Sequence, residues 1–420
     1  MKYHFCILFT FTIPTLSAQI YLDHHTRHRF AQLNLGLDLQ FNTQDTTHYF
    51  DAEDQIQELN LPTLFTPRFL IGGTHFWGHA DFYISIPWYV PTFSEANQQI
   101  QFSSSVETVF KYYPLPIRQK GIRPFIGFSI APFQYRQDNK NFTYGSGPEL
   151  THTSLPLLTG LTYHHHNQLL EARLMWNYAN KQEYYIDCIT EVDVGTPPLY
   201  IDISYRFILE TTISAEADWE SGQTAMTTTT LAQQGKLNGF YIGAGMSSAF
   251  WTGKSSYNEA VRPYISPYPI SLMPDFTLGY YFHKPDINMD LAYRGYSTST
   301  DTYGAVQDLK RRSLGLEATK FLFDYHGFVP FVGPVISYEK LFFTEHFEDQ
   351  LTYDLSDEKI AYGLTFGWDI RPNRLQSFII RTNLRWYPDL DLKVDDDTSI
   401  SFNAIEFNFI QLVVYLNRIL

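Results

Sequence analysis

Sixteen charged residues lie at alternate positions within apolar segments, and they are the side chains whose types and spacing could do chemistry. Ten are acids and six are bases. If their shared face lines a water-filled interior, the excess of acids would favour cations or polar solutes. If water is excluded, the same charges would form salt bridges and only fill space. The sixteen candidates are Asp38, Asp81, Glu107, Lys111, Glu171, Arg173, Asp202, Arg206, Asp290, Arg294, Glu317, Glu339, Asp369, Arg381, Arg385 and Glu406.

A nucleophile beside a base would indicate an enzyme, and the nearest approach to such a pair is His75 with Ser85. In an alternating strand pattern Ser85 shares a face with Asp81, whereas His75 falls on the opposite face with Phe69. The two side chains therefore do not converge. The sequence predicts no enzymatic activity and no cofactor.

Clusters of acids and histidines are candidate metal ligands. Dense carboxylates could hold Ca²⁺, but no twelve-residue calcium loop with its glycine is present, and solvated loop charge is the favoured interpretation. Adjacent histidines in a turn rarely converge on one ion, so we expect no metal. The acidic clusters are 51–54, 345–349 and 389–397, and the histidine clusters are 24–28 and 164–166.

The first eighteen residues have the order of a secretory signal peptide. Lys2 precedes the apolar run 5–11, and small residues lead to Ala18, after which we expect cleavage. This leaves Cys188 as the only cysteine, so an internal disulfide is excluded. A net charge of −14 argues against a nucleic-acid partner, because phosphate binding needs a basic surface.

The elements that must position the charged residues are β-strands. In 31–41 leucines and Phe41 alternate with polar residues, which a two-residue repeat separates into two faces and a helix would scatter. Aromatic residues make up 17% of the chain and charged residues only 18%. An exported chain with this pattern is expected to place one strand face in lipid and the other in a polar interior.

The sequence carries an internal duplication, because short motifs of its first half recur in the same order in its second half. Pro124-Phe-Ile-Gly127 recurs as Pro330-Phe-Val-Gly333, and Gly160-Leu-Thr-Tyr163 recurs as Gly363-Leu-Thr-Phe366. We therefore divide the chain into a signal peptide (1–18), a first eight-strand repeat (19–212), a connecting hairpin or linker (213–235) and a second eight-strand repeat (236–420). The strands are expected near 29–42, 66–76, 79–91, 103–114, 122–136, 153–164, 168–179, 198–212, 236–251, 273–283, 286–297, 312–324, 328–342, 359–370, 375–387 and 400–417.

Connections between these strands alternate between short and long, which places all long loops at one end of an antiparallel barrel. Five tryptophans fall near strand ends and are expected in aromatic girdles at the lipid interface, namely Trp77, Trp88, Trp176, Trp251 and Trp386.

On the two Pro-Phe-(Ile/Val)-Gly strand starts and the alternating strands, the chain resembles the bacterial outer-membrane β-barrel superfamily, with each half similar to a small OmpA/OmpX-like eight-stranded module. The resemblance implies an all-β fold, a transmembrane antiparallel up-and-down β-barrel in the outer membrane of a Gram-negative-type bacterium. It also implies contact with outer-membrane lipids and the barrel assembly machinery. It names no solute and no oligomeric state.

The two repeats could join as one barrel of about 16 strands or close as two tandem eight-stranded barrels. The difference matters because about 16 strands leave an aqueous channel, whereas about eight leave an interior filled by side chains. Alternation from Leu209 to Trp219 and the β preference of Thr227–Thr230 favour a joining hairpin, hence one barrel. Inward glycines such as Gly36 and Gly127 favour tight curvature, hence two.

The leading functional hypothesis is then a porin-like passive channel or transporter for small polar solutes or ions. The alternative is a non-conducting structural or adhesive surface barrel that displays long acidic extracellular loops. A lipid-modifying enzyme of the outer membrane is a distant third hypothesis.

Overall fold

The computed structural model describes residues 32–419 except 52, 54, 116–119, 140–146, 210–222, 252, 325–327 and 371–376. The expected signal peptide lies outside the described residues. So do most of two short connections that the alternation of short and long connections predicts, at 324–327 and 371–374. All sixteen expected barrel strands are present, so the all-β antiparallel fold class is confirmed.

Each repeat closes on itself. In the first repeat (barrel 1), antiparallel ladders join eight strands in chain order, and the last strand, β15, pairs back with β1. Its strands are β1 (Gln32–Asn42), β4 (Phe65–His75), β5 (Ala80–Pro87), β8 (Glu107–Tyr112), β9 (Lys120–Asn139), β11 (Leu157–His165), β12 (Gln168–Trp176) and β15 (Leu199–Leu209).

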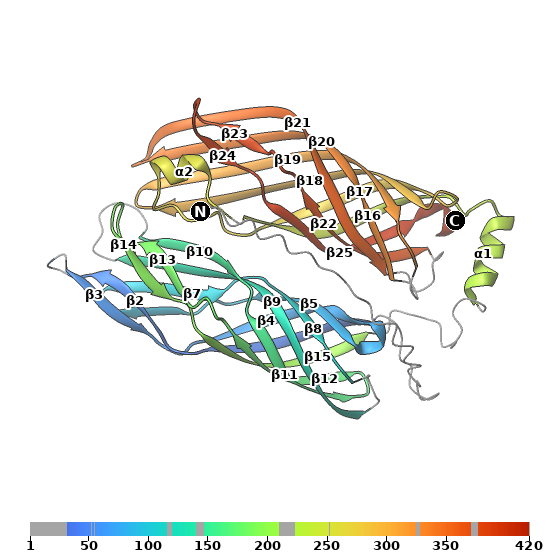
Figure 1. The fold of residues 1–420 in the computed structure, drawn as a ribbon, viewed down its shortest axis with the longest axis horizontal. Helices are drawn as coiled ribbons and strands as arrows, with labels where there is room; N and C mark the ends of the chain where they lie inside the picture. Colours follow the sequence, from blue (N-terminus) through green and yellow to red (C-terminus); the bar gives the residue numbers. More distant parts are fainter. Residues whose placement is uncertain are drawn as a thin grey trace.

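The second repeat (barrel 2) closes in the same way, with its last strand, β25, paired to its first strand, β16. Figure 1 shows the two barrels lying side by side, with barrel 1 in blue to green and barrel 2 in yellow to red. Its strands are β16 (Gly239–Phe250), β17 (Ser271–Phe282), β18 (Ile287–Thr302), β19 (Ala305–Phe321), β20 (Phe328–Phe347), β21 (Gln350–Ile370), β22 (Phe378–Trp386) and β25 (Ile405–Tyr415).

The favoured prediction of one sixteen-stranded barrel is therefore wrong, and the two tandem barrels kept as its alternative are what the chain forms. With β4 on one side of β1 and β15 on the other, barrel 1 has no open edge for barrel 2 to join. The inward glycines allow this tight closure. A Cβ added at Gly36 would lie 2.3 Å from the Tyr205 carbonyl oxygen and 2.6 Å from Arg206 Cγ.

The joining hairpin is also wrong where the structure describes it. Thr227–Thr230 lie in helix α1 (Gln223–Gln233), and the rest of the expected hairpin, 213–222, lies outside the described residues. A β preference is expressed only where a partner strand is available. Since both barrels are closed, this threonine run meets no free edge and its Ala, Met and Leu neighbours suit a helix.

The long connections carry structure of their own that the alternation pattern did not predict. They form short hairpins and strands that extend the barrel walls at one end of both barrels, the long-loop end (Figure 1). These elements are β2 (Asp45–Phe50), β3 (Ile56–Leu61), β6 (Thr92–Glu95), β7 (Gln98–Ser104), β10 (Glu149–Ser154), β13 (Lys181–Tyr185), β14 (Glu191–Gly195), α2 (Ser256–Val261), β23 (Asp391–Lys393) and β24 (Ser399–Ser401).

The opposite end, the short-turn end, holds tight connections such as η1 (Phe76–Gly78) between β4 and β5, and the closing helix α3 (Leu416–Ile419). The barrels contact each other laterally through outward-facing aromatic residues. The Phe82 ring lies 6.1 Å from Trp368 and 6.0 Å from Phe407. The barrels also meet at both ends, so they form a pair with parallel orientation (Figure 1).

Candidate functional site

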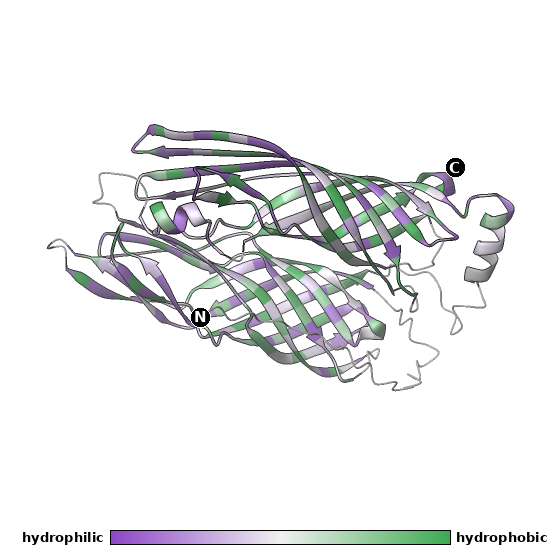
Figure 2. Ribbon diagram, turned by 45° about the horizontal axis from the view of Figure 1, so that its top comes forward, coloured by the Kyte–Doolittle hydropathy of each residue, from purple (hydrophilic) through white to green (hydrophobic). Residues whose placement is uncertain are grey.

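The outer faces of both barrels are apolar and exposed, which is the reverse of a water-soluble barrel. On β1 the outward Leu35, Leu37 and Leu39 are exposed, and Leu364 and Phe366 are exposed in the same way on β21. Figure 2 shows hydrophobic and hydrophilic residues alternating along the strands, with hydrophilic residues prominent toward the long-loop end. Nine of the sixteen barrel strands have 9–12 residues, close to the length that crosses a bilayer.

The girdle prediction holds for three of the five tryptophans and is wrong for Trp251, while the side chain of Trp77 is not among those that the structure describes. Trp88, Trp176 and Trp386 are exposed on the outer surface. Trp251 is buried, packed edge-on against Tyr268 and Tyr296 inside the long-loop end of barrel 2. Position near a strand end does not say which side a side chain faces once the strand has ended.

The structure places all sixteen candidate residues inside the two barrels. Each of them is at most 4% exposed. Side chains lining a water-filled pore would be accessible to water, so at these positions the interiors are packed. The strict alternation of the strands is what put every one of them on the inner face.

In barrel 1 these residues form two groups of ion pairs, the first of which is centred on Arg173. Arg173 reaches Asp202 at 2.7 Å, Glu107 at 3.4 Å and Asp38 at 3.6 Å. Arg173 also donates to the Tyr83 hydroxyl at 3.2 Å. One guanidinium thus joins three strands on different sides of the barrel.

A second group of charges lies beside it in barrel 1. Arg206 binds Asp81 at 2.6 Å and Glu171 at 2.9 Å, and Lys111 donates to the same Glu171. The Lys111 ammonium also lies over the Tyr83 ring. Every cation of this group therefore meets at least one carboxylate, as buried charges must.

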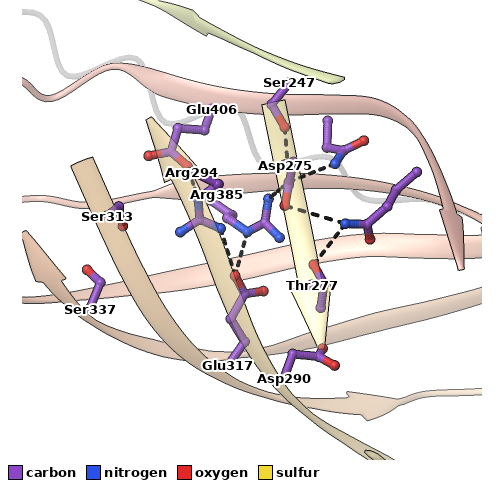
Figure 3. A network of polar contacts seen from close by, with 12 residues as sticks. Ser247, Asp275, Thr277, Asp290, Arg294, Ser313, Glu317, Ser337, Arg385 and Glu406 are labelled. Atoms are coloured by element: carbon purple, nitrogen blue, oxygen red, sulfur yellow. Dashed lines mark hydrogen bonds and ion pairs between the residues drawn. The ribbon is translucent and has the colours of Figure 1, made fainter. Parts of the chain in front are cut away.

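Barrel 2 contains the corresponding network, drawn in Figure 3. Arg385 lies between Asp275 and Glu317, at 2.7 Å from each. Arg294 joins Glu317 at 2.8 Å to Glu406 at 3.0 Å. The dashed lines in the figure also link Asp275 to Ser247, which donates to it at 3.1 Å.

Two further groups of ion pairs hold the remaining predicted residues of barrel 2, one around Arg311 and one around Arg381. Arg311 donates two hydrogen bonds to Glu339, of 2.8 and 2.9 Å, and also binds Glu406. Arg381 binds Asp369 at 2.8 Å and Asp290 at 3.5 Å.

Sequence reasoning missed several members of these networks. Arg68 donates to Ser85 at 2.7 Å and lies 3.9 Å from Glu107, and Asp275 holds Arg385. Both could have been found, since each sits between two outward residues of a further repeated pair of tripeptides, Pro67-Arg-Phe69 and Pro274-Asp-Phe276. Arg311 was missed because the expected strand began at 312, whereas β19 begins at Ala305.

These additions change the charge balance inside barrel 1. Among the described residues of its strands, five buried acids now face five buried bases, because Arg68 and Arg123 join the predicted set. The excess of acids expected for a cation-selective lining is absent from this part of barrel 1.

Aromatic and aliphatic layers occupy the rest of each interior. Near the short-turn end of barrel 2, buried Tyr241, Tyr281, Phe321, Phe331 and others form one cluster. In barrel 1, Tyr83, Tyr113, Phe125 and neighbouring side chains form a comparable layer. Charged and apolar layers together fill the wall-to-wall space that an eight-stranded barrel leaves.

The long-loop end of barrel 2 is closed by a folded cap. Helix α2 lies over the extended strands β18–β21, and Tyr257 from this helix donates to Glu345 at 2.9 Å. Asn258 and Gln307 exchange hydrogen bonds of 2.9 and 3.2 Å beside it. Arg262 at the end of the helix lies 3.1 Å from Glu345.

The long-loop ends of the two barrels also touch. Ser266 donates to the Glu149 carbonyl oxygen at 2.7 Å, and Thr300 donates to the Glu149 carboxylate at 3.2 Å. Burial raises the pKa of Glu149. Tyr303 donates to the Tyr185 carbonyl oxygen at 3.1 Å, so three hydrogen bonds bridge the barrels here.

The residues considered above for catalysis or metal binding do not come together in one site among the described residues. His75 faces outward from β4, whereas Ser85 faces inward and accepts from Arg68, so the pair lies on opposite sides of the barrel wall. Asp395 accepts hydrogen bonds from Thr398 and from the backbone of Asp397, which hold its pKa below the ordinary value. Within the described ranges, His, Cys, Asp and Glu side chains form no group of three that could hold a metal ion. His24, His25 and His28 lie outside these ranges.

In the part of the chain that the structure describes, no helix is long and apolar enough to cross a membrane.

Comparisons with known proteins return distant structural likenesses. No family model matches, and no curated protein matches. Among solved structures, neisserial surface protein A is similar over 42% of this chain and 97% of its own, at 16% identity and a TM-score of 0.31. An outer-membrane channel from Pseudomonas putida F1 covers 92% of this chain and 95% of its own, at 9% identity and a TM-score of 0.20.

The transport unit of the autotransporter AIDA-I from Escherichia coli covers 95% of this chain and 94% of its own, at 8% identity and a TM-score of 0.22. Likenesses this distant identify no function for the chain.

Proposed function

We propose that this chain is an outer-membrane protein in which two non-conducting eight-stranded barrels act together as an anchor for one extracellular surface. The observation that carries the proposal is the packing of the interiors, where every predicted lining residue is buried and ion-paired. The sequence favoured a porin-like channel. The geometry favours the alternative, a surface barrel that displays its long loops.

The proposed membrane location rests on the reversed polarity of the barrels. An apolar outer face is costly in water and stabilising in lipid, while buried charges inside are tolerated because they are paired. We assign the long-loop end to the cell exterior, because barrels of this kind keep short turns on the periplasmic side. The exterior would then carry α2, the acidic loops and the hydrogen bonds that join the barrels at Glu149.

Conductance of the refolded mature protein in a planar bilayer tests the non-conducting part of the proposal. The account predicts that the bilayer stays silent although protease protection shows that the barrels have inserted. Addition of a sixteen-stranded porin to the same bilayer provides the positive control. A stable, repeatable current step from the protein itself would overturn the proposal and restore the channel hypothesis.

Cys188 provides a direct test of the orientation. Its thiol is exposed in the β13–β14 hairpin at the long-loop end, and partial burial and the charge of Asp187 raise its pKa. A membrane-impermeant maleimide applied to intact cells at mildly alkaline pH should therefore label it. In a Cys188→Ser background, Lys284→Cys at the short-turn end should be labelled only after the outer membrane is permeabilised. The reverse pattern would invert the assignment.

A further inference from the structure

A crevice runs between the two barrels, near their short-turn ends. The atom-free space in and around it amounts to about 410 Å³, a volume that includes space open to the surroundings. Barrel 1 contributes one wall from β1, β4 and β5, and barrel 2 contributes the other from β21, β22 and β25. The side chains that carry the argument are Leu33, His75, Phe82, Ile380, Phe409 and Ile410.

The crevice is continuous with the surface that faces lipid. Leu33 and Ile410 lie in its walls, and the next outward residues on the same strands are Leu35 and Leu412. These two leucines are 41% and 48% exposed on the outer face. Acyl chains are therefore the medium at this surface, and an apolar space beside it would take up an acyl chain in preference to water.

One polar atom in the crevice has no partner among the described residues. The Nδ1 atom of His75 is buried and makes no hydrogen bond. The hydroxyl of Thr382, which also lines the space, donates to the Phe409 carbonyl oxygen at 2.9 Å and is already satisfied. A buried imidazole nitrogen without a partner is costly, and a polar group of a bound molecule at this place would remove that cost.

The position of His75 along the barrel defines where that polar group lies. His75 is the last residue of β4, immediately before the short turn η1. In the orientation proposed above, this is the periplasmic boundary of the membrane, where the glycerol and phosphate groups of inner-leaflet lipids lie. The apolar remainder of the crevice extends from there toward the middle of the bilayer, between Phe82 and Phe409.

We propose that the seam between the barrels is a binding site for one glycerophospholipid of the periplasmic leaflet. An acyl chain fills the crevice, and an ester or phosphate oxygen accepts a hydrogen bond from His75 Nδ1. The lipid completes the apolar contact between the barrels near their short-turn ends. This inference rests on the membrane location proposed above.

Native mass spectrometry of the full mature protein, extracted from its own membranes in a detergent that contains no phosphate, tests the site. The wild type should carry one phospholipid per chain after delipidating washes. Ile410→Phe should fill the crevice and His75→Leu should remove the hydrogen bond, and each should lower the occupancy about tenfold. The matched control is Ile336→Phe, since Ile336 faces lipid on β20 and does not line the crevice.

Retention of the lipid by Ile336→Phe and its loss from the two crevice variants would establish the site. No retained phospholipid in the wild type, equal loss in all three variants, or lipid A as the retained species would each overturn it. Failure of the membrane proposal is distinguishable, because the protein would then not float with membranes in a density gradient at all.

Discussion

At the scale of single residues, the interior ion pairs have to be complete rather than merely numerous. Arg311 makes two hydrogen bonds to Glu339 and a third to Glu406, all three groups being buried. Removing one partner of such a group leaves an unpaired carboxylate in a medium that solvates it poorly.

Arg311→Met should therefore destabilise barrel 2 by about 3 to 5 kcal/mol. The free energy of unfolding, measured by urea titration of the protein in lipid vesicles, checks this. The additional change Glu339→Gln should recover part of the loss. Lys340→Met breaks the exposed pair between Lys340 on β20 and Glu358 on β21 and should leave the free energy of unfolding unchanged. A similar small effect at both positions would mean that water reaches Arg311.

The sequence could predict which charged residues face inward, but it could not predict which of them form ion pairs with each other. Alternation alone placed Glu107 and Arg173 on inner faces, and the structure agrees. That these two side chains bind each other, and that Arg68 joins Glu107 from a third strand, depends on barrel curvature and on rotamers. The alternation of residues along a strand determines neither the barrel curvature nor the rotamers.

At the scale of elements, the barrel walls divide into an apolar band, which the proposed location places in lipid, and a polar extension at the long-loop end. Strands β18 to β21 have 16 to 21 residues, which exceeds the 9–11 that cross a bilayer. The excess lies at the long-loop end, where β21 carries exposed polar residues such as Asp354 and Glu358. In the proposed membrane location, the same outward face would therefore meet lipid near the short-turn end and water near the long-loop end.

A pair of matched substitutions tests this division. Leu37→Arg on β1 should cost about 2 to 4 kcal/mol, because Leu37 faces the lipid band. Leu351→Arg, on the extension of β21, should be tolerated although Leu351 is 59% exposed and Leu37 is 47% exposed. Urea titration in vesicles compares the two, and equal costs would contradict the band.

The sixteen barrel strands could be predicted because two-residue alternation is a strong local signal. The small strands of the loops could not. For example, β13 and β14 pair only with each other, and their residues are too few to show a periodicity. The threonines of α1 carried a strand preference that no partner strand realises.

At the scale of the whole molecule, the pairing of the first and last strands of each repeat determines what the barrels enclose. One barrel of about 16 strands would enclose water, while two barrels of eight strands enclose packed side chains. Local patterns are the same in both arrangements, because only the partners of the first and last strands of each repeat differ. The glycines on the inner face were the one sequence feature that favoured separate closure, and Gly36 lies against Arg206 in the structure.

The most direct test of separate closure is a disulfide between β1 and β15. Leu37 and Tyr205 are opposite each other in this ladder, which brings their Cα atoms within about 6 Å, a separation that a disulfide can bridge. In a Cys188→Ser background, Leu37→Cys with Tyr205→Cys should crosslink within one chain upon mild oxidation in the membrane. Tyr205→Cys with Ile242→Cys, which would be neighbours only if β15 continued into β16, should not. A crosslink in the second pair and none in the first would contradict the account.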